Sequence, residues 1–575
     1  MNIKKLIPIL EWLPNYNKSL FKGDFVAGLT VGIFLVPQGI AYALIAGLPP
    51  IYGLYCALVP QVMYAIFGSS RQVAIGPVAM DSLIVATGVS TLALAGSESY
   101  IAIAILLAFI VGSIQFLMGV FRLGFIVNFL SKPVITGFTS AVALIIGLTQ
   151  MGNLVGIKFA QSDQIHTVIN EIFSHFSSFN LNTTIIGSVA ILSIIILRKV
   201  NKKIPSALLV IIIGILIMRF FTNQFSDVSI VKDIPGGLPS FSFPEIDIGQ
   251  IRELLPIALT LVMVGYLETI SIGKTLEAKQ DVYKVRPNQE LIALGLSNIF
   301  GSFFKAYPSS SSFSRSAVNE ESGGKTGMSA LISVLIVVLT LLFLMPLFYY
   351  LPKTVLAAII IVAVFRLINI KEGKFLWRSN KLDFWLMIAT FLSTLFFGVE
   401  YGIIIGVGLS LIILIFRTSK PYVVELGQVP NSNFYRNKER FKDVVLDDEV
   451  LVFRFDAQLF YANANYFRDK LGEMAEAKGK ALKLIVLDGE SINRIDSTGI
   501  EMLKEQIKFY KKKNILFFFA GIKGPVRDDL FRSGILDLID LNHFFMRAYH
   551  AVKYYKTGDR NHQQKYANYI HQAYK

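Results

Sequence analysis

Apolar segments follow one another almost without interruption between Phe25 and Phe416, and this feature constrains the fold more than any other. Most of them are long enough to cross the hydrocarbon core of a bilayer as a helix. Charged residues make up 17% of the chain, below the roughly 25% of soluble domains. The sequence therefore predicts an α-helical polytopic membrane protein. The single cysteine, Cys56, excludes an intrachain disulfide.

Fourteen apolar segments are predicted, and two of them cannot be complete helices that face lipid. The third opens with Gly76-Pro77, and the tenth follows Pro308 and a run of serines and contains Arg315. The third and tenth segments are at equivalent positions if the fourteen split seven and seven, so they predict an internal repeat with two half-helices and a transporter binding site. The segments cover residues 25–46, 51–67, 74–91, 101–120, 125–147, 184–198, 205–221, 252–273, 289–304, 310–320, 328–347, 352–369, 382–399 and 401–417.

The distribution of Lys and Arg predicts the orientation. Basic groups precede the first segment, separate the sixth from the seventh, and separate the twelfth from the thirteenth. Each group follows an even number of crossings, so we expect both termini in the cytoplasm and the protein in the cell (inner) membrane. Residues 1–24 form a cytoplasmic lead-in rather than a secretory signal, because Pro8 breaks their short apolar stretch. Residues 25–420 form the transmembrane domain.

The composition changes after Pro421. Short apolar runs at 450–455, 482–487 and 515–520 predict strands, and residues 464–477, 499–512 and 526–533 predict helices. Strands that alternate with helices indicate a small α/β domain over 421–560. Residues 561–575 are expected to form a tail.

Charge and motif content exclude several functions. The net charge is +15, from 55 Lys and Arg against 40 Asp and Glu. The basic residues form no stripe interleaved with aromatic residues, so nucleic acid is not an expected partner. The six histidines lie outside the apolar segments, and no nucleophile–base pair or metal-ligand cluster is present in the sequence. We therefore expect no cofactor, no metal and no enzymatic activity.

The two interrupted segments predict an anion site. A half-helix that begins inside the membrane directs unpaired N–H groups and a partial positive charge toward its start. The first offers the backbone at Gly76, Val78 and Ala79, and the second adds Ser312, Ser314 and Arg315. An arginine inside a membrane span is functional by default. The serines have an alternative role, because serine hydroxyls often cap helices.

Two carboxylates are candidates for proton coupling. Glu268 lies in the middle of segment 252–273, where a low dielectric favours the protonated acid. Protonation would leave the charge of Arg315 free to hold an anion, which amounts to proton–anion symport. A static salt bridge with Arg315 or Lys274 is the alternative. Asp81 is a weaker candidate, which could equally cap the half-helix or pair across helices.

The first segment contributes a polar residue at a depth suited to the same site. Gln38 follows Pro37 and can donate to a substrate, and Phe34 and Tyr42 flank it by one helical turn. Both rings could line the pocket, although aromatic residues in a span more often pack against neighbouring helices.

Five motifs stand out along the apolar part of the chain: Pro37-Gln38-Gly39-Ile40-Ala41-Tyr42, Gly47-Leu48-Pro49-Pro50, Gly76-Pro77-Val78-Ala79, Ser312-Phe313-Ser314-Arg315-Ser316 and Gly323-Gly324-Lys325-Thr326. They resemble the sulfate permease (SulP) family of anion transporters. The resemblance implies a 7+7 inverted repeat, a core domain that moves against a gate domain, a homodimer, and anion contacts from Ser314 and Arg315. It also matches Glu268 to the glutamate of proton-coupled sulfate members. Gln38 stands where some bacterial members carry a second glutamate.

The carboxyl-terminal part resembles a STAS domain through Ile495-Asp496-Ser497-Thr498-Gly499. The resemblance implies a possible regulatory phosphorylation at Ser497 or Thr498 and a possible cytoplasmic partner. The alternative is that Asp496 and Ser497 only cap the helix that begins near Gly499.

The leading prediction is a secondary active transporter that takes up sulfate with protons by alternating access. A bicarbonate or dicarboxylate symporter and an anion exchanger are alternatives of the same class. A membrane sensor that signals through its STAS domain is an alternative of a different class.

Overall fold

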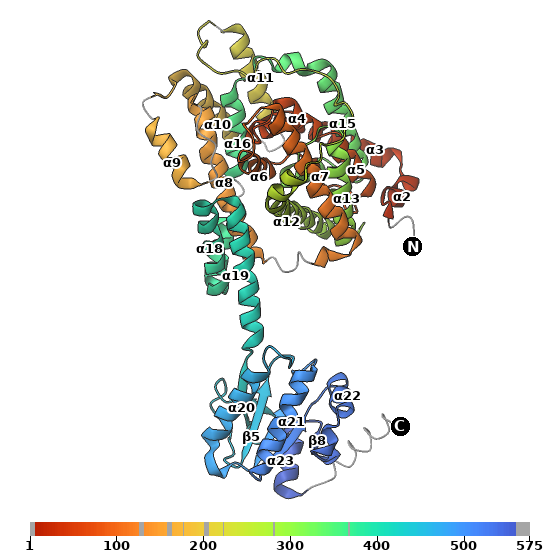
Figure 1. The fold of residues 1–575 in the computed structure, drawn as a ribbon, viewed down its shortest axis with the longest axis vertical. Coiled ribbons are helices and arrows are strands. Elements are labelled where there is room, and N and C mark those ends of the chain that lie inside the picture. Colours follow the sequence, from red (N-terminus) through yellow and green to blue (C-terminus); the bar gives the residue numbers. More distant parts are fainter. Residues whose placement is uncertain are drawn as a thin grey trace. The chain divides into compact units, whose positions relative to one another are not determined.

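The computed structural model describes residues 6–125, 131–157, 164–175, 178–200, 206–221, 223–279, 282–365 and 368–558. The chain divides into two compact units between Ser410 and Leu411 (Figure 1). This division falls inside helix α19 (Val399–Ser419), ten residues before the predicted boundary at 420. The predicted tail, 561–575, lies outside the described residues.

The first unit is helical. Seven helical stretches in the described part of the chain are long and apolar enough to cross a membrane, and four shorter helices are also apolar. Besides α19, its helices are α2 (Ile9–Trp12), α3 (Lys18–Ile45), α4 (Pro50–Tyr55), α5 (Val59–Phe67), α6 (Ala79–Val89), α7 (Glu98–Val120), α8 (Lys132–Val155), α9 (Ile165–Ser174), α10 (Leu181–Val200), α11 (Ser206–Phe220), α12 (Ile248–Lys279), α13 (Pro287–Ser302), α14 (Phe313–Glu321), α15 (Met328–Leu339), α16 (Lys353–Val364), α17 (Ile370–Ser379) and α18 (Lys381–Phe397).

All fourteen predicted segments contain helix, and the differences lie mainly at their ends. The second segment is two helices, α4 and α5, because Pro60 stands in the first turn of α5 and cannot continue α4. The fifth is displaced: α8 starts with Pro133 in its first turn and ends at Gly156, whose φ of 83° is the left-handed conformation typical of a helix end. The amphipathic helices α9 and α17 were not predicted.

The helices of the first unit form two groups. One group contains α3, α5, α7, α12, α13, α14 and α15, and the other contains α8, α10, α16 and α18 (Figure 1). In the first group α7 and α13 cross with almost no space between their backbones. A Cβ built on Gly112 would lie 2.8 Å from the Gly295 carbonyl oxygen, and one on Gly295 would lie 2.5 Å from the Phe116 nitrogen. Glycine is therefore required at this crossing.

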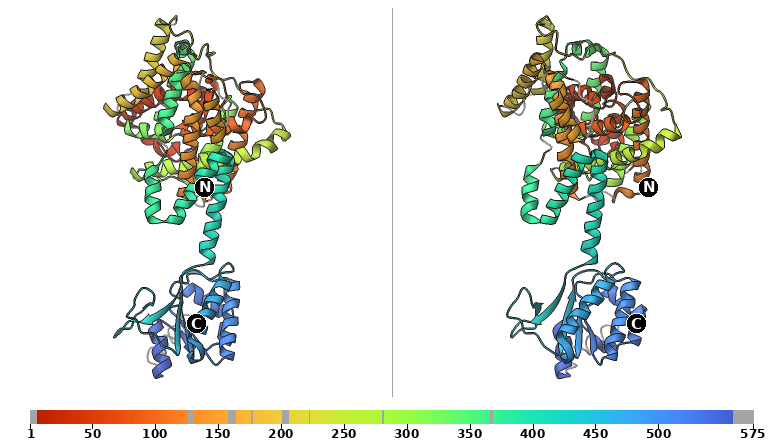
Figure 2. Two further views of the ribbon diagram at one scale, coloured as in Figure 1. Left: turned by 90° about the vertical axis from the view of Figure 1, so that its left-hand side faces the viewer. Right: turned by 60° about the vertical axis from the view of Figure 1, so that its left-hand side comes forward.

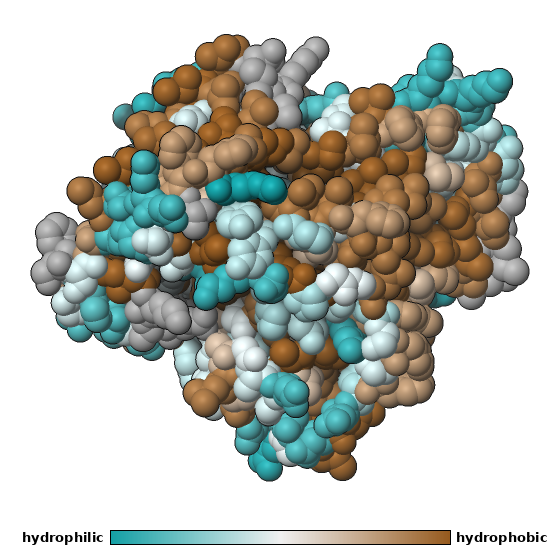
Figure 3. Space-filling model, turned by 90° about the horizontal axis from the view of Figure 1, so that it is seen from above, coloured by the Kyte–Doolittle hydropathy of each residue, from teal (hydrophilic) through white to brown (hydrophobic). Residues whose placement is uncertain are grey.

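Apolar side chains cover wide areas of the molecular surface, with hydrophilic patches between them (Figure 3). Many large apolar residues of α10, α11 and α19 are exposed, among them Ile196, Ile213 and Ile412. A soluble protein rarely exposes continuous apolar surface of this extent, whereas a lipid-facing surface requires it.

The second unit is an α/β domain with one six-stranded sheet (Figure 2). The sheet order is β4-β3-β5-β6-β7-β8, antiparallel between β4, β3 and β5 and parallel from β5 to β8. The strands are β3 (Val423–Gln428), β4 (Tyr435–Asn437), β5 (Val450–Phe455), β6 (Leu484–Asp488), β7 (Leu516–Ala520) and β8 (Phe544–Phe545). The helices are α20 (Ala464–Lys478), α21 (Ser497–Lys512), α22 (Gly524–Arg532) and α23 (Ala548–Thr557).

Alternate side chains of each central strand enter two separate cores. Leu451, Phe453 and Phe455 of β5 pack in the core that contains α20, α21 and α22. Val450 and Val452 pack in the core that contains α23. The three predicted strands and three predicted helices are therefore confirmed, whereas β3, β4, β8 and α23 were not predicted.

Candidate functional site

Two short strands bring the interrupted segments together. β1 (Ile75–Gly76) pairs antiparallel with β2 (Ser310–Ser311), with Ile75 opposite Ser311 and Gly76 opposite Ser310. The Ser312 nitrogen extends this pairing by donating to the Ala74 carbonyl oxygen at 3.0 Å. Helix α6 begins three residues after β1, and α14 begins two residues after β2. The starts of the two half-helices therefore lie side by side, as the sequence predicts.

The two helix starts differ in how their N–H groups are satisfied. The Ser312 side chain caps α14 by accepting a hydrogen bond from the Arg315 nitrogen at 3.4 Å. Helix α6 follows Val78, whose side chain cannot cap it. Ser314 is exposed, Ala79 is buried and Val78 is half-buried. The start of α6 therefore keeps backbone donors that no described side chain caps, which suits an anion.

Arg315 lies at the junction and is only 1% exposed. Its Nη1 donates to the Pro77 carbonyl oxygen at 2.9 Å and to Gln38 Oε1 at 3.3 Å. Its Nε and Nη2 have no hydrogen-bond partner among the described residues. A Cβ on Gly76 would lie 3.4 Å from Nη2, so glycine keeps this edge of the guanidinium open. The Nε–Nη2 edge is the one that can hold two oxygens of an oxyanion at once.

Two carboxyl groups, those of the buried Asp81 and the half-buried Glu268, lie within electrostatic reach of Arg315. Asp81, in the first turn of α6, accepts a hydrogen bond from the Ser310 hydroxyl, and its Oδ1 has no partner in the described part of the chain. Glu268 of α12 keeps Oε2 without a partner there. Within the described ranges Glu268 forms no ion pair with Arg315 or Lys274, and Lys274 pairs instead with Glu277 at 2.6 Å. The geometry thus does not favour the static salt-bridge interpretation.

The aromatic candidates lie on α3. Tyr42 is buried and within electrostatic reach of Arg315. Phe34 is half-buried one turn before Gln38, and no contact places it at the guanidinium. The structure therefore brings Gln38, Gly76, Asp81, Ser312 and Arg315 together directly and places Tyr42 and Glu268 around them.

Three residues that hold β2 in place were missed. Asn298 of α13 accepts from the Ser309 nitrogen at 2.9 Å and donates to the Ser309 carbonyl oxygen at 3.1 Å and to Gln115 Oε1 at 3.1 Å. The Thr269 hydroxyl of α12 donates to the Ser311 hydroxyl at 2.9 Å. The only sequence signal for these three residues, Gln115, Asn298 and Thr269, was that each is polar inside an apolar segment. The sequence does not show that together they position β2, because they come from three different helices.

Comparison with known proteins decides the family. A model described as the sulfate permease family matches residues 21–390, and a STAS domain model matches residues 442–551. The chain belongs to the sulfate permease family. Sulfate transporter 4.1, chloroplastic, of Arabidopsis thaliana is 40% identical to this family member over 569 residues, which cover 96% of this chain and 82% of the relative. High affinity sulfate transporter 2 of Stylosanthes hamata is 33% identical over 576 residues, which cover 96% and 87%.

Solved structures of anion transporters have the same fold. The murine Solute Carrier 26 family member A9 anion transporter, in the inward-facing state, has a TM-score of 0.89 at 27% identity over 96% of this chain and 94% of that one. The transmembrane domain of a cyanobacterium bicarbonate transporter, BicA, has a TM-score of 0.58 at 22% identity over 69% of this chain and 98% of that one, which concerns the fold alone. This sulfate permease family member is therefore a multi-pass membrane transporter with a carboxyl-terminal STAS domain.

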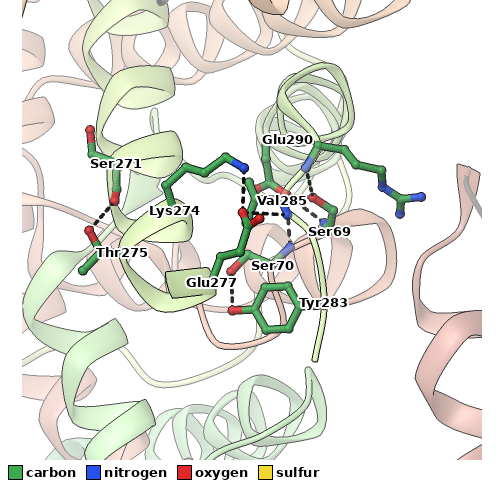
Figure 4. Close-up of polar contacts among 10 residues, drawn as sticks. Ser69, Ser70, Ser271, Lys274, Thr275, Glu277, Tyr283, Val285 and Glu290 are labelled. Carbon is green, nitrogen blue, oxygen red and sulfur yellow. Dashed lines mark hydrogen bonds and ion pairs between the residues drawn. The ribbon is translucent and has the colours of Figure 1, made fainter. Parts of the chain in front are cut away.

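A buried polar cluster fixes the loop that leads to β1 in this permease family member (Figure 4). Glu290 of α13 accepts hydrogen bonds from the Tyr64 hydroxyl, from the Ser69 nitrogen at 2.8 Å and from the Ser70 nitrogen at 3.1 Å. The Arg286 nitrogen donates to the Ser69 hydroxyl at 2.9 Å. The cluster therefore ties the approach to β1 to the helix that holds β2.

The STAS loop has a defined cap. Asp496 accepts from the Gly499 nitrogen at 2.8 Å and from the Tyr461 nitrogen at 2.9 Å. Helix α21 begins at Ser497, so capping by Asp496 is confirmed and capping by Ser497 is wrong. Ser497 and Thr498 are exposed, and their regulatory role stays a prediction.

Proposed function

We propose that this protein takes up a sulfate-like inorganic anion together with protons, by alternating access. The observation that carries the proposal is the buried Nε–Nη2 edge of Arg315, which has no hydrogen-bond partner among the described residues. A buried cation with unused donors is unfavourable unless a ligand satisfies it. An oxyanion bound by this edge and by the first N–H groups of α6 would satisfy both.

The charges suggest how protons couple to the anion. With Asp81 and Glu268 ionised, Arg315 contributes +1 and the two carboxylates −2, so the cluster carries −1 and disfavours an anion. With both protonated, the cluster carries +1 and attracts it. Each carboxyl group has one buried oxygen without a described partner, which a proton can occupy without breaking a bond. Proton binding and anion binding therefore support each other, which is the requirement for symport.

Sulfate is proposed as the substrate because the relatives named above are sulfate transporters and because a tetrahedral oxyanion can use both guanidinium donors at once. Bicarbonate or a dicarboxylate could use the same donors, and exchange could replace symport. We further propose a homodimer in the cell (inner) membrane with both termini in the cytoplasm. The placement of Lys and Arg supports the orientation of the termini.

Uptake of radiolabelled sulfate into proteoliposomes tests the proposal. We expect uptake to accelerate when the outside is made acidic and to be lost in Arg315→Ala. Unlabelled sulfate, bicarbonate and a dicarboxylate are added as competitors. If bicarbonate or the dicarboxylate inhibits uptake more strongly than unlabelled sulfate does, that anion and not sulfate is the substrate. Sulfate uptake that requires internal sulfate and ignores the proton gradient would indicate an exchanger instead. Transport of no anion would favour the sensor.

A further inference from the structure

A cavity of about 710 Å³ lies between α8, α17 and α18, and none of its lining residues belongs to the anion site. Most of its wall is apolar, with Phe384, Met387, Ile388 and Phe391 contributed by α18. Lys374 and Arg378 of α17 also line it. The volume is within the range of ligand sites, and the lining suits a molecule with an apolar chain and a negative charge.

Helix α17 carries a row of cations beside this cavity. Lys371, Lys374 and Arg378 are spaced i, i+3 and i+7, which places them on one face of the helix. All three side chains are exposed, and no ion pair joins any of them to a described residue. The acidic residue of the helix, Glu372, is already paired with Lys132 at 2.8 Å. The row is therefore uncompensated positive charge.

Aromatic residues show the surroundings in which this row lies. The rings of Trp377 and Phe384 meet edge to face at 4.9 Å, and Lys381 lies over Trp377 at 5.6 Å. Trp385 is 58% exposed. Tryptophan beside lysine is typical of the interface between headgroups and acyl chains, and a basic amphipathic helix lies in the same layer. The cavity therefore adjoins the bilayer surface rather than open water.

We propose that this cavity binds one anionic phospholipid from the leaflet at α17. Its phosphate contacts Lys374 and Arg378, and one acyl chain enters the apolar part of the cavity between α8 and α18. The apolar wall disfavours a soluble anion, because such an anion would leave that wall unfilled. The uncompensated cations select an anionic headgroup over a zwitterionic one.

Photolabelling of the full-length protein in nanodiscs tests the proposal. The probes are phosphatidylglycerol and phosphatidylcholine, each carrying a diazirine on one acyl chain, and labelled peptides are mapped by mass spectrometry. We expect phosphatidylglycerol to label the stretch 368–391 at least fivefold more than phosphatidylcholine does. The double variant Lys374→Gln, Arg378→Gln should remove this preference. Ile388→Trp, which fills the cavity and keeps both charges, should lower labelling by the same lipid.

The matched control is Lys508→Gln, Lys512→Gln, which removes two exposed charges from α21 and should leave the labelling unchanged. Equal labelling by the two lipids, or undiminished labelling in either cavity variant, would overturn the proposal. Crosslinks between two protein copies at 368–391, formed by an added reagent with two lysine-reactive groups, in place of lipid labelling would also overturn it, because a second copy would then occupy the surface.

Discussion

The guanidinium of Arg315 donates to the carbonyl oxygen of Pro77 at 2.9 Å, so the cation of one half-helix is bound to the chain that enters the other. The two residues are far apart in sequence, yet the β1–β2 pairing makes them neighbours. One edge of the guanidinium is thereby fixed, and the other has no hydrogen-bond partner among the described residues.

Replacing Arg315 with lysine should weaken anion binding although the charge is kept. Lysine is a point charge, and its single nitrogen cannot present the paired Nε and Nη2 donors to an anion while it also donates to Pro77 and Gln38. We expect the KM for sulfate to rise roughly 10- to 100-fold, as for the loss of one charged bidentate contact. Arg252→Lys, an exposed position on α12, is the control and should not change KM. An unchanged KM in Arg315→Lys would show that a bidentate contact from Arg315 does not contribute to sulfate binding.

Replacing Glu268 with glutamine should weaken the pH dependence of transport. Glutamine imitates the protonated acid, so the charge of the cluster then changes only with the protonation of Asp81. Wild-type uptake should increase as the outside pH falls from about 7.5 to about 5.5, and the increase in Glu268→Gln should be smaller, because one of the two coupling carboxyl groups is gone. The control Glu253→Gln lies on the exposed face of the same helix. If Glu268→Gln keeps the wild-type pH response, Glu268 does not couple protons to transport, and Asp81 is the next residue to test.

Adding one methyl group at Gly295 should destabilise the first unit. The new Cβ would lie 2.5 Å from the Phe116 nitrogen, and backbone atoms cannot move away as a flexible side chain can. We expect Gly295→Ala to cost about 1–3 kcal/mol, as overpacking does. All three tryptophans lie in this unit, so their fluorescence follows its thermal unfolding. Gly408→Ala in α19 has no described atom within 4 Å of its new Cβ and should be neutral or stabilising. Equal melting of the two variants would contradict the tight crossing.

Asp488 should make the STAS domain less stable as the pH rises. Burial, with help from Glu490 and Asp456, raises the pKa of Asp488 from 3.8 to about 6. The folded state therefore holds its proton more tightly than the unfolded chain, and the stabilisation present below about pH 4 is lost as the pH rises through about 6. Asp488→Asn should be more stable than wild type at pH 7.5 by roughly 1–3 kcal/mol and equal at pH 4. Hydrogen exchange of β6 measures this, because the domain contains no tryptophan. If β6 is equally protected in Asp488→Asn and in the wild type at pH 7.5, the ionised Asp488 does not destabilise the folded domain.

The sequence was most informative where a charged or helix-breaking residue stands inside an apolar segment. Arg315, Glu268 and Asp81 interrupt apolar segments, and Gly76-Pro77 cannot continue a helix, so half-helices and charges were predictable. The pairing of Gly76 with Ser310 was expected only as proximity, since a two-residue strand has no periodicity. Asn298 looked like any polar residue in a span until its bonds to Ser309 were visible.

Amphipathic helices posed a different difficulty. Residues 370–379 contain three cations and were interpreted as a cytoplasmic connection, because a hydropathy pattern does not distinguish a loop from a helix lying flat on a membrane. Phe545 of the two-residue β8 packs in the same core as Phe518 and α23, so the position of β8 depends on a contact that is distant in sequence.

The glycine crossing of α7 and α13 bears on how the anion site could move. Backbones this close cannot slide past each other, so the two helices behave as one rigid unit. Asn298 holds β2 against this unit by hydrogen bonds, and Glu290 does the same for the loop that leads to β1. A rigid-body displacement of the unit would move the bound anion with it, and the distances around Arg315 would be preserved from one side of the membrane to the other.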